Sequence, residues 1–443
     1  MRARRAGRRL AAVLLALVSC LLLPSTPRGE TGPERLDRLR AGVRFAPRRP
    51  GRDGAARNLG PAYGASVGAQ PLPDGSPGQS PEVQASHGVA GTQSETSIAV
   101  FGPIVVIGFN QINGNRGSGA AWSIDGGLTF TDGGGLPTGG PLPKELLGDP
   151  SVTVCGNGTF YYASVYFPNA VDAAVAVNVG TLSGPTLTWS NPKIAAVSTN
   201  DFLDKEWLTC DRATNVLYMV YTRFVNGNIG LSGPLQVEII KSADGGTTWS
   251  PPLVLESSAT ESVQIAYLSV GPNGEVYALW ERGVDDISVT ETRLEFRRSF
   301  DSAASFEPRV VVRTMAPSFY PANVGFNRED TLEIGTLAVD ASTGPDRGAL
   351  YVIWVERETP DAFPRDVFLA RSVDRGATWS APLRVNDDGP GNDQVMPWVS
   401  VNGRGVVETT WYDYRNWAGM STTDVYAARS TDGGRTFGPN FRV

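Results

Sequence analysis

The stretch SIDGGLTF, residues 123–130, has close copies further along the chain. They are SADGGTTW at 242–249, SVDRGATW at 372–379 and STDGGRTF at 430–437. Two degenerate copies occupy the gaps, at 299–306 and at 183–190. The six centres recur at a period of about 60 residues, with one longer interval. A repeat of this length predicts an array of similar structural units.

Each copy suits a tight turn between two strands. The aspartate accepts hydrogen bonds from the N–H groups of the turn, glycine supplies a positive φ, and the terminal aromatic residue packs between neighbouring strands. We therefore predict a structural role for the repeated aspartates, which are Asp125, Asp244, Asp301, Asp374 and Asp432.

A second pattern recurs in phase with the first. Each unit opens with a short apolar run, at 97–100, 151–154, 206–209, 266–269, 335–338 and 397–400. A β-rich run such as VYALW (276–280) follows, and two further strands flank the aspartate turn. Four short strands per unit, without helical periodicity, are typical of a propeller blade. We predict an all-β, six-bladed β-propeller over residues 94–443.

The amino-acid composition excludes several kinds of site and partner. The 443 residues include 1 histidine and 3 cysteines, which excludes a histidine-rich zinc site and a disulfide-built scaffold. The net charge is -6, yet residues 1–57 contain 14 Arg and 4 acidic residues, so the remaining chain is strongly acidic. An acidic body disfavours nucleic acid as a partner. Any hydrolytic site must use carboxylates, tyrosines and arginines.

The N-terminal residues resemble an export signal. A basic stretch at 1–10 precedes an apolar stretch at 11–23, which is too short to cross a bilayer as a helix. We predict a signal peptide over 1–25, a spacer rich in Pro, Gly, Ala and Arg over 26–93, and a secreted, extracellular protein. Cys20 also lies in a stretch that resembles a lipoprotein cleavage box, so a lipid anchor at Cys20 is the alternative.

Cys155 and Cys210 occupy the same place in the second and third units. Equivalent positions of adjacent blades lie side by side, and an exported protein meets oxidising conditions, so we predict a disulfide between them. The alternative is a pair of buried thiols that pack as small apolar residues.

The repeats and the blade pattern resemble the bacterial sialidase superfamily, in which such Asp-box repeats mark a six-bladed propeller. The resemblance covers about residues 94–443 and implies an active site on the face opposite the boxes. That site would be built from the starts of the innermost strands and the ends of the second strands. Counting two residues back from each apolar run gives the predicted mouth of the channel: Glu95, Asp149, Asp204, Gln264, Glu333 and Val395.

The resemblance implies a glycoside hydrolase that acts on extracellular glycans. Aromatic rings stack on sugars, arginines hold a sugar carboxylate, and an acid pair acts at the anomeric carbon. In sialidases the nucleophile is a tyrosine assisted by a glutamate, and an aspartate is the acid/base. The catalytic candidates are Asp149, Glu281, Asp413, Tyr412 and Tyr414. The candidates for substrate binding are Arg223, Arg282, Glu356, Arg357 and Arg415.

Two alternatives stay open for these charged residues. They could form ion pairs between blades, in which case the propeller would bind a carbohydrate or protein partner without catalysis. The family's first arginine belongs to an Arg-Ile-Pro motif, and this chain has QSETS at 93–97 instead. Either another arginine such as Arg223 replaces it, or the ligand is not a sialic acid.

We expect a monomer without a cofactor or a metal in its catalytic machinery. The loop NDDGPGND at 386–393 is a candidate for calcium through oxygen ligands, although it does not have EF-hand spacing. The alternative is an acidic turn in contact with water.

Overall fold

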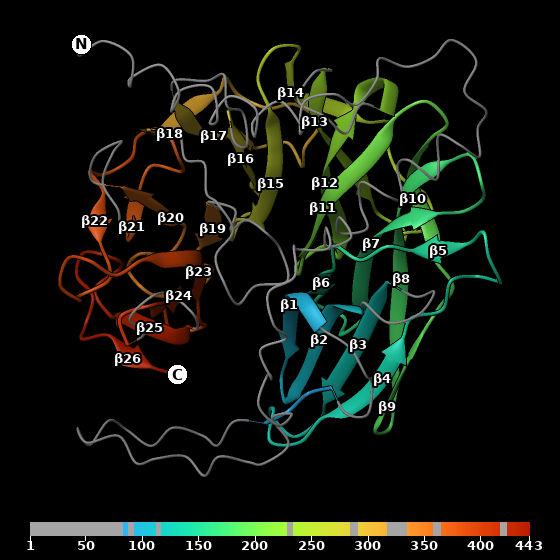
Figure 1. Cartoon of the computed structure of the whole chain (residues 1–443), viewed down its shortest axis with the longest axis horizontal. Coiled ribbons are helices and arrows are strands. Elements are labelled where there is room, and N and C mark those ends of the chain that lie inside the picture. The colour runs from blue at the N-terminus through green and yellow to red at the C-terminus, as the bar shows by residue number, and fades with distance from the viewer. Residues whose placement is uncertain are drawn as a thin grey trace, which may run out of the picture.

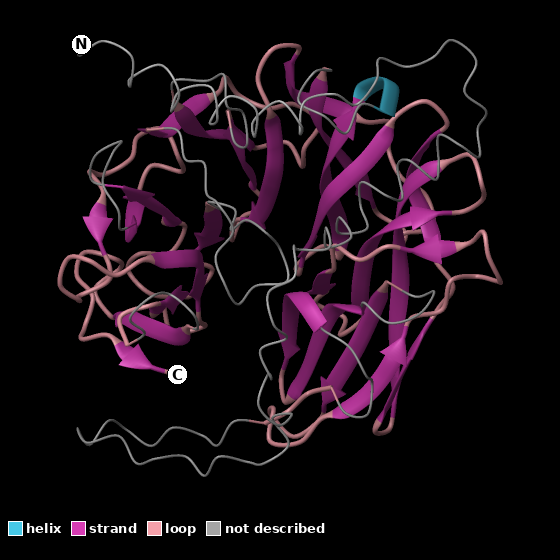
Figure 2. Cartoon of the chain, viewed as in Figure 1, coloured by secondary structure: helices cyan, strands magenta, loops and turns pink. Residues whose placement is uncertain are grey.

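The computed structural model describes residues 83–86, 93–111, 117–227, 234–283, 291–316, 335–357, 365–416 and 423–443. These residues form six antiparallel sheets that follow one another in chain order around a centre (Figure 1). Almost all regular structure is strand (Figure 2), and the described helical segment is the short η1 (Val225–Gly227). The predicted all-β, six-bladed propeller is therefore confirmed. No described helix is long and apolar enough to cross a membrane.

The first three sheets are built from consecutive strands. Blade one contains β1 (Gln93–Phe101), β2 (Ile104–Gln111), β3 (Ser118–Ser123) and β4 (Thr131–Gly135). Blade two contains β5 (Glu145–Leu146), β6 (Ser151–Val154), β7 (Phe160–Phe167), β8 (Ala173–Ser183), β9 (Thr186–Trp189) and β10 (Lys193–Ser198). Blade three contains β11 (Phe202–Asp211), β12 (Val216–Phe224), β13 (Leu235–Ser242) and β14 (Leu253–Ser258).

The last three sheets have four strands each. Blade four contains β15 (Val263–Val270), β16 (Val276–Arg282), β17 (Thr292–Ser299) and β18 (Val310–Met315). Blade five contains β19 (Thr336–Val339), β20 (Leu350–Arg357), β21 (Arg365–Ser372) and β22 (Leu383–Arg384). Blade six contains β23 (Gln394–Val401), β24 (Val407–Asp413), β25 (Asp424–Ser430) and β26 (Phe441–Arg442). No sheet among the described residues combines strands from both ends of the chain.

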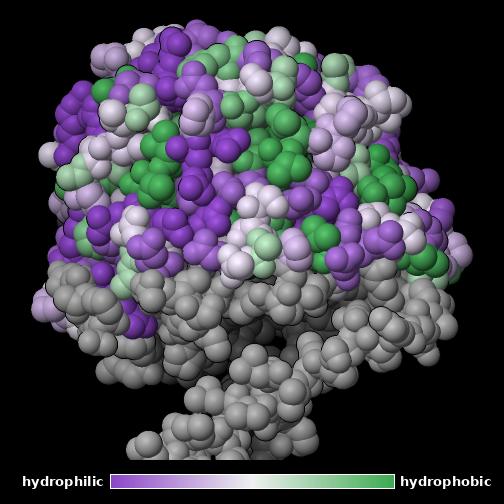
Figure 3. All heavy atoms as spheres, turned by 90° about the horizontal axis from the view of Figure 1, so that it is seen from above, coloured by the Kyte–Doolittle hydropathy of each residue, from purple (hydrophilic) through white to green (hydrophobic). Residues whose placement is uncertain are grey.

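Apolar side chains fill the junctions between blades. Phe167 of blade two stacks on Phe202 of blade three, with ring centroids 6.4 Å apart. Phe296 of blade four meets Trp379, the terminal aromatic residue of the aspartate turn in blade five, at 5.4 Å. Because blade five buries both faces of its sheet against its neighbours, its second strand β20 is almost entirely apolar. The rim of the molecule in Figure 3 is mostly hydrophilic, with separate apolar patches.

The aspartate turns share one hydrogen-bond pattern. In blade three, Ser242 Oγ donates to Asp244 Oδ1 at 2.8 Å, and Thr248 Oγ1 donates to Asp244 Oδ2 at 2.6 Å. The same contacts surround Asp125, Asp301, Asp374 and Asp432. Gly245 and Gly246 have φ of 70° and 76°, the left-handed region that the turn requires.

A disulfide joins Cys155, just after β6, to Cys210 at the end of β11. Their Cα atoms are 5.4 Å apart, and both residues are buried among the side chains that pack blade two against blade three. The covalent bond therefore links two adjacent blades near the centre of the ring.

The innermost strands contain a β-bulge. Pairing to the second strand shifts between Ser94 and Ser97 in β1, and at the equivalent places in β11, β15 and β23. Two inner-strand residues then face one residue of the partner, and the first of them has a left-handed backbone. These first bulge residues are Glu95, Asp149, Lys205, Ile265 and Met396, with φ of 50°, 54°, 54°, 55° and 51°.

The bulge corrects the predicted composition of the channel mouth. Blades one and two keep Glu95 and Asp149, but Lys205, Ile265 and Met396 stand where Asp204, Gln264 and Val395 were predicted. In blades three, four and six the apolar run begins at the second bulge residue. Counting two residues back from the start of the run therefore gives the residue before the first bulge residue. Glu333 lies outside the described residues.

Candidate functional site

Charged residues gather where the inner strands of blades one to three begin. We call Glu95, Asp149, Asp204, Lys205 and Glu206 the channel cluster. Glu95 lies in the bulge of β1, Asp149 directly precedes β6, and the other three follow one another in β11. The bulges turn these residues out of the regular pleat, which is why neighbouring blades bring them together.

The best-defined contact of the cluster crosses from blade three to blade two. Lys205 Nζ lies 2.7 Å from Asp149 Oδ2, and the exposed fractions of the two side chains are 21% and 14%. Asn110 joins blade one to the same group, because its Nδ2 donates to Glu95 Oε2 at 2.8 Å and its Oδ1 accepts from Asp149 N at 2.9 Å. A side chain at Gly148 would collide with the Asn110 amide, so glycine is needed there.

Two acids of the cluster resist ionisation. Burial raises the pKa of Asp204 to about 7, and the Asp149 carboxylate adds to this effect while Lys205 opposes it. Burial also raises the pKa of Glu206 well above its usual range, again with a contribution from Asp149. Glu206 is 3% exposed, and neither of its carboxyl oxygens has a hydrogen-bond partner among the described residues. Near neutral pH Glu206 therefore stays protonated and Asp204 is only partly ionised, beside an aspartate that is paired with lysine.

Three aromatic rings meet beside the cluster. Trp207, Tyr267 and Trp398 each follow the bulge of an inner strand, in blades three, four and six. The ring centroids of Trp207 and Tyr267 are 4.8 Å apart, and those of Trp207 and Trp398 are 5.4 Å apart. Tyr267 and Trp398 meet at 5.7 Å, and Trp398 remains 39% exposed. This aromatic trio crosses the ring from one side to the other.

Glu281 lies next to the aromatic trio. Its Oε1 accepts from Gly335 N, the backbone of the next blade, at 2.7 Å, and its side chain is buried. Burial raises the pKa of Tyr267, and Glu281 is the strongest of the charges that raise it further, ahead of Glu95 and Asp149. A tyrosine in this setting stays protonated, so Tyr267 is a poor nucleophile.

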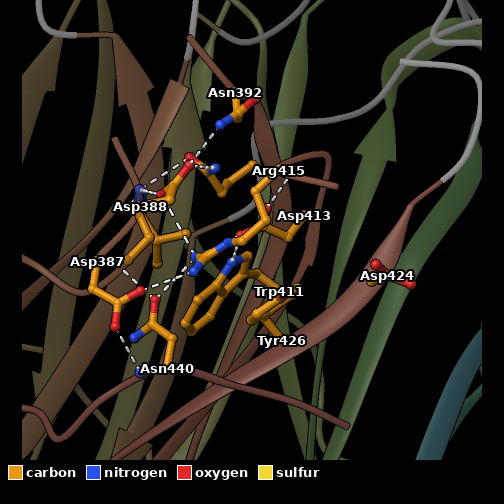
Figure 4. Close-up of polar contacts among 12 residues, drawn as sticks. Asp387, Asp388, Asn392, Trp411, Asp413, Arg415, Asp424, Tyr426 and Asn440 are labelled. Atoms are coloured by element: carbon orange, nitrogen blue, oxygen red, sulfur yellow. Dashed lines mark hydrogen bonds and ion pairs between the residues drawn. The ribbon is translucent and has the colours of Figure 1, made fainter. Parts of the chain in front are cut away.

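The predicted site residues of blade six lie elsewhere. Asp413 is fully buried and accepts hydrogen bonds from Trp411 Nε1 at 2.7 Å and from Arg415 N at 2.8 Å (Figure 4). Tyr414 is also buried, and burial raises its pKa to about 12. Tyr412 points the other way and is exposed. The structure thus brings Asp149 and Glu281 to the centre but engages Asp413 within its own blade.

Arg415 connects blade six to the acidic loop at 386–393. It forms ion pairs with Asp413 at 2.9 Å and Asp387 at 2.8 Å, and its guanidinium lies 4.1 Å from the centre of the Tyr426 ring. Asp388 accepts a hydrogen bond from the Asn386 amide at 2.7 Å. Asp388 also accepts from the Asn392 amide, which Figure 4 labels. The carboxylates of the loop are therefore engaged by protein donors.

Calcium would have to displace those donors. Asp393, at the end of the loop, binds the Arg365 guanidinium with Nε 2.8 Å from Oδ1. The described part of the chain contains no group of three or more His, Cys, Asp or Glu side chains placed to hold a metal ion. Calcium at this loop stays a prediction, and it requires that the carboxylates exchange these protein donors for the ion.

Arg223 and Arg282, two of the predicted arginines for substrate binding, are held by protein carboxylates. Arg223 binds Asp201 at 2.8 Å and Glu238 at 2.9 Å. Arg282 is surrounded by three glutamates, namely Glu256, Glu261 and Glu295. Glu356 receives Arg313 at 2.6 Å, and Arg357 ends β20 opposite Arg365. These ion pairs fix the ends of the second strands.

Lys205, Glu206 and the aromatic trio were not among the predicted site residues. One signal was available, because Asp204-Lys205-Glu206 is a charged triplet inside an otherwise apolar strand. The aromatic trio also had a signal, because its members stand at the second position of the apolar runs at 206–209, 266–269 and 397–400, although only the tertiary structure brings them into contact.

No protein-family model and no curated protein matches the chain. Among solved structures, the α-L-arabinofuranosidase of Fusarium graminearum with an iminosugar inhibitor has a TM-score of 0.52 and 13% identity, covering 76% of this chain and 92% of that chain. Its complex with arabinobiose gives 0.51 and 12%, with the same coverage. A Trypanosoma rangeli sialidase with sialic acid gives 0.48 and 11%, covering 77% of this chain and 54% of that chain. At such identities the likeness shows the propeller fold alone.

Proposed function

We propose that the chain is a glycoside hydrolase whose acid and base come from the channel cluster. In this proposal Asp204, whose carboxyl group is hydrogen-bonded to Asp149, is the proton donor to the glycosidic oxygen, and Asp149 is the base that activates water. Asp149 and Glu281 remain catalytic candidates, but Asp149 serves only as the base, with Asp204 as the acid, and Glu281 lies beside the aromatic trio. The same proposal leaves Asp413, Tyr412 and Tyr414 outside the chemistry.

The observation that carries the proposal is the unlike state of two neighbouring carboxyl groups. Glycoside hydrolysis needs one protonated and one ionised carboxyl at the same bond. The raised pKa of Asp204 supplies the first, and the ion pair of Asp149 with Lys205 supports the second. Trp398, partly exposed on the aromatic trio, offers a surface on which a sugar ring could stack.

A neutral sugar suits this site better than a sialic acid. A substrate carboxylate needs an arginine that is available to bind it bidentately. Arg223, Arg282 and Arg415 are each held by two or more protein carboxylates, and Glu95 stands where sialidases carry their first arginine. We therefore propose uncharged extracellular glycans as the substrate class.

Fluorogenic glycosides test the proposal directly. The purified chain is assayed against arabinofuranosides, hexopyranosides and a sialoside, together with D149N and D204N. We expect turnover of at least one neutral glycoside and a loss of at least about 100-fold in kcat/KM in each variant. D244N, which changes an aspartate turn, is the matched control and should retain activity. Absence of turnover on the whole panel, or full activity of D149N and D204N, would overturn the proposal.

One observation favours a second candidate function. Because so many acids and arginines at the ends of the second strands are already paired, the same face could bind a glycan or protein without cleaving it. Isothermal titration with the neutral sugars of the panel separates the two functions. Saturable binding, weakened in W398A and unaccompanied by turnover, would support the binding function.

We also propose that the protein is exported and works outside the cell as a monomer. Residues 1–25 and Cys20 lie outside the described residues. Intact-mass analysis of the protein from the culture medium tests the leader, since a mature N-terminus after about residue 25 is expected for plain secretion. A mass that begins at a lipid-modified Cys20 would instead identify a lipid anchor.

A further inference from the structure

One position of the channel cluster carries a residue of the opposite charge from its equivalents. The first bulge residue is Glu95 in blade one and Asp149 in blade two, but Lys205 in blade three. Lys205 adopts φ of 54°, which a lysine occupies at some cost, so the bulge holds it there. Its side chain is thereby directed at the adjacent blade rather than along its own sheet.

The ion-pair partner of Lys205 is Asp149, the equivalent residue of blade two. Nζ reaches Asp149 Oδ2 at 2.7 Å, and both side chains are mostly buried. A contact at this distance between partly desolvated charges is stronger than an exposed ion pair. The backbone N–H of Asp149 also donates a hydrogen bond to the side-chain Oδ1 of Asn110. Asp149 is therefore held between two neighbours, one of which is a full positive charge.

We propose that Lys205 is the positioning residue of this site: its ammonium holds the Asp149 carboxylate in place and keeps it ionised beside the carboxyl groups of Asp204 and Glu206. The inference rests on the proposed function, because it assigns the acid and the base of that reaction. Lys205 itself transfers no proton and forms no bond to substrate.

The surroundings support this assignment. Among the described residues, the titratable groups linked electrostatically to Lys205 or to its neighbours in the site are Glu95 on β1, Asp149 before β6, Tyr162 on β7, Asp204 and Glu206 on β11, Tyr267 on β15 and Glu281 on β16. Lys205 is the one cation in that set, so its removal leaves only acids and tyrosines. Two adjacent carboxyl groups do not both ionise without a counter-charge.

Replacing the ammonium should move the pH dependence of the site. In K205M, Asp149 takes up a proton at higher pH than in the wild type, so the acidic limb of kcat/KM shifts upward by about one pH unit or more. At pH values on that limb this corresponds to a loss of about tenfold. K205R keeps the charge and should restore the wild-type profile. In the D149N background, K205M should leave the pH dependence of any residual kcat/KM unchanged.

A second measurement does not depend on catalysis. Asp204 and Glu206 have raised folded-state pKa values, so they lower stability as pH rises above their unfolded values near 4. Lys205 opposes both shifts. In K205M the free energy of unfolding should therefore continue to fall to a higher pH than in the wild type. Urea unfolding of wild type, K205M and K205R across pH 4 to 9 measures this.

The outcomes separate the inference from the proposed function. A shifted stability profile in K205M, restored by K205R, supports the role of Lys205 even if no glycoside is cleaved. If K205M cleaves a glycoside with the wild-type pH dependence of kcat/KM and also has the wild-type pH dependence of unfolding, the glycosidase proposal is unaffected and the role of Lys205 is overturned. If K205M does not fold, K205Q and the comparison of K205R with wild type give the same readouts.

Discussion

Trp207 and Trp398 bring their ring centroids to 5.4 Å although they belong to blade three and blade six. Tyr267 of blade four completes the contact at 4.8 Å from Trp207. Rings from three blades therefore touch across the centre, beside the channel cluster. This contact couples blades that are not neighbours in the chain.

A double-mutant cycle measures that coupling. W207A and W398A should each lower the free energy of unfolding, and the double variant should lose less than the sum by about 0.5–1.5 kcal/mol, because each ring packs on the other. Urea unfolding gives the values. W122A combined with W398A is the control, since Trp122 packs in blade one with a different set of residues. Additivity of W207A and W398A would contradict the contact.

The Cys155–Cys210 disulfide should contribute to stability. We expect C155S/C210S to lower the free energy of unfolding by about 2–4 kcal/mol, because the bond closes a long segment of the unfolded chain. Alkylation of the denatured protein without reductant should label neither cysteine, whereas reductant should add two labels. Labelling of both residues in the unreduced protein would show free thiols and contradict the disulfide.

The Arg365–Asp393 ion pair is a buried pair in blade five. The exposed fractions of its side chains are 0% and 1%. R365M should lower the free energy of unfolding by about 3–5 kcal/mol, since it leaves a carboxylate without its counter-charge, and R365M/D393L should recover much of that loss. R429M removes the exposed Arg429–Glu408 pair and should cost less than about 1 kcal/mol. Equal losses in R365M and R429M would be inconsistent with burial of the first pair.

Asp204 should make the protein less stable as pH rises. Its folded pKa of about 7 lies above the unfolded value near 4, so the folded state binds more protons between these values. The stabilising effect of its proton is complete below pH 4 and is lost as pH rises through 7. D204N should remove this slope, which is at most about 1.4 kcal/mol per pH unit. An unchanged slope in D204N would argue against a raised pKa.

The aspartate turns should act in the opposite direction at low pH. Burial opposes the effect, but hydrogen bonds from Thr378 and Ser372 outweigh it and lower the pKa of Asp374 to about 2. Stability from this carboxylate is present above pH 4 and is lost as pH falls through 2. D374N should therefore unfold at a lower temperature at pH 7 but approach the wild type near pH 2. A constant difference in Tm between pH 7 and pH 2 would show that ionisation of Asp374 is irrelevant.

The charged residues at the strand ends show where prediction from sequence stopped. The sequence indicated which acids and arginines occupy the second strands, and Arg223, Arg282 and Arg415 do lie at those ends. It could not show that each one is held by carboxylates of its own or an adjacent blade, such as Asp201 for Arg223. Those partners depend on distances of a few ångströms across a junction, which no local pattern encodes.

The sequence by itself determines the number of blades, their boundaries and the positions of the aspartate turns. The reason is that the repeat is local, and that short β-rich runs between turn residues predict the strands. The composition of the channel cluster was decided only by the tertiary structure. A β-bulge changes by one position which residue takes its first place, and it brings Lys205, next to Asp204, into contact with Asp149. That single step adds a base to a group of acids, and the aromatic trio beside it exists only because the ring brings blades three, four and six together.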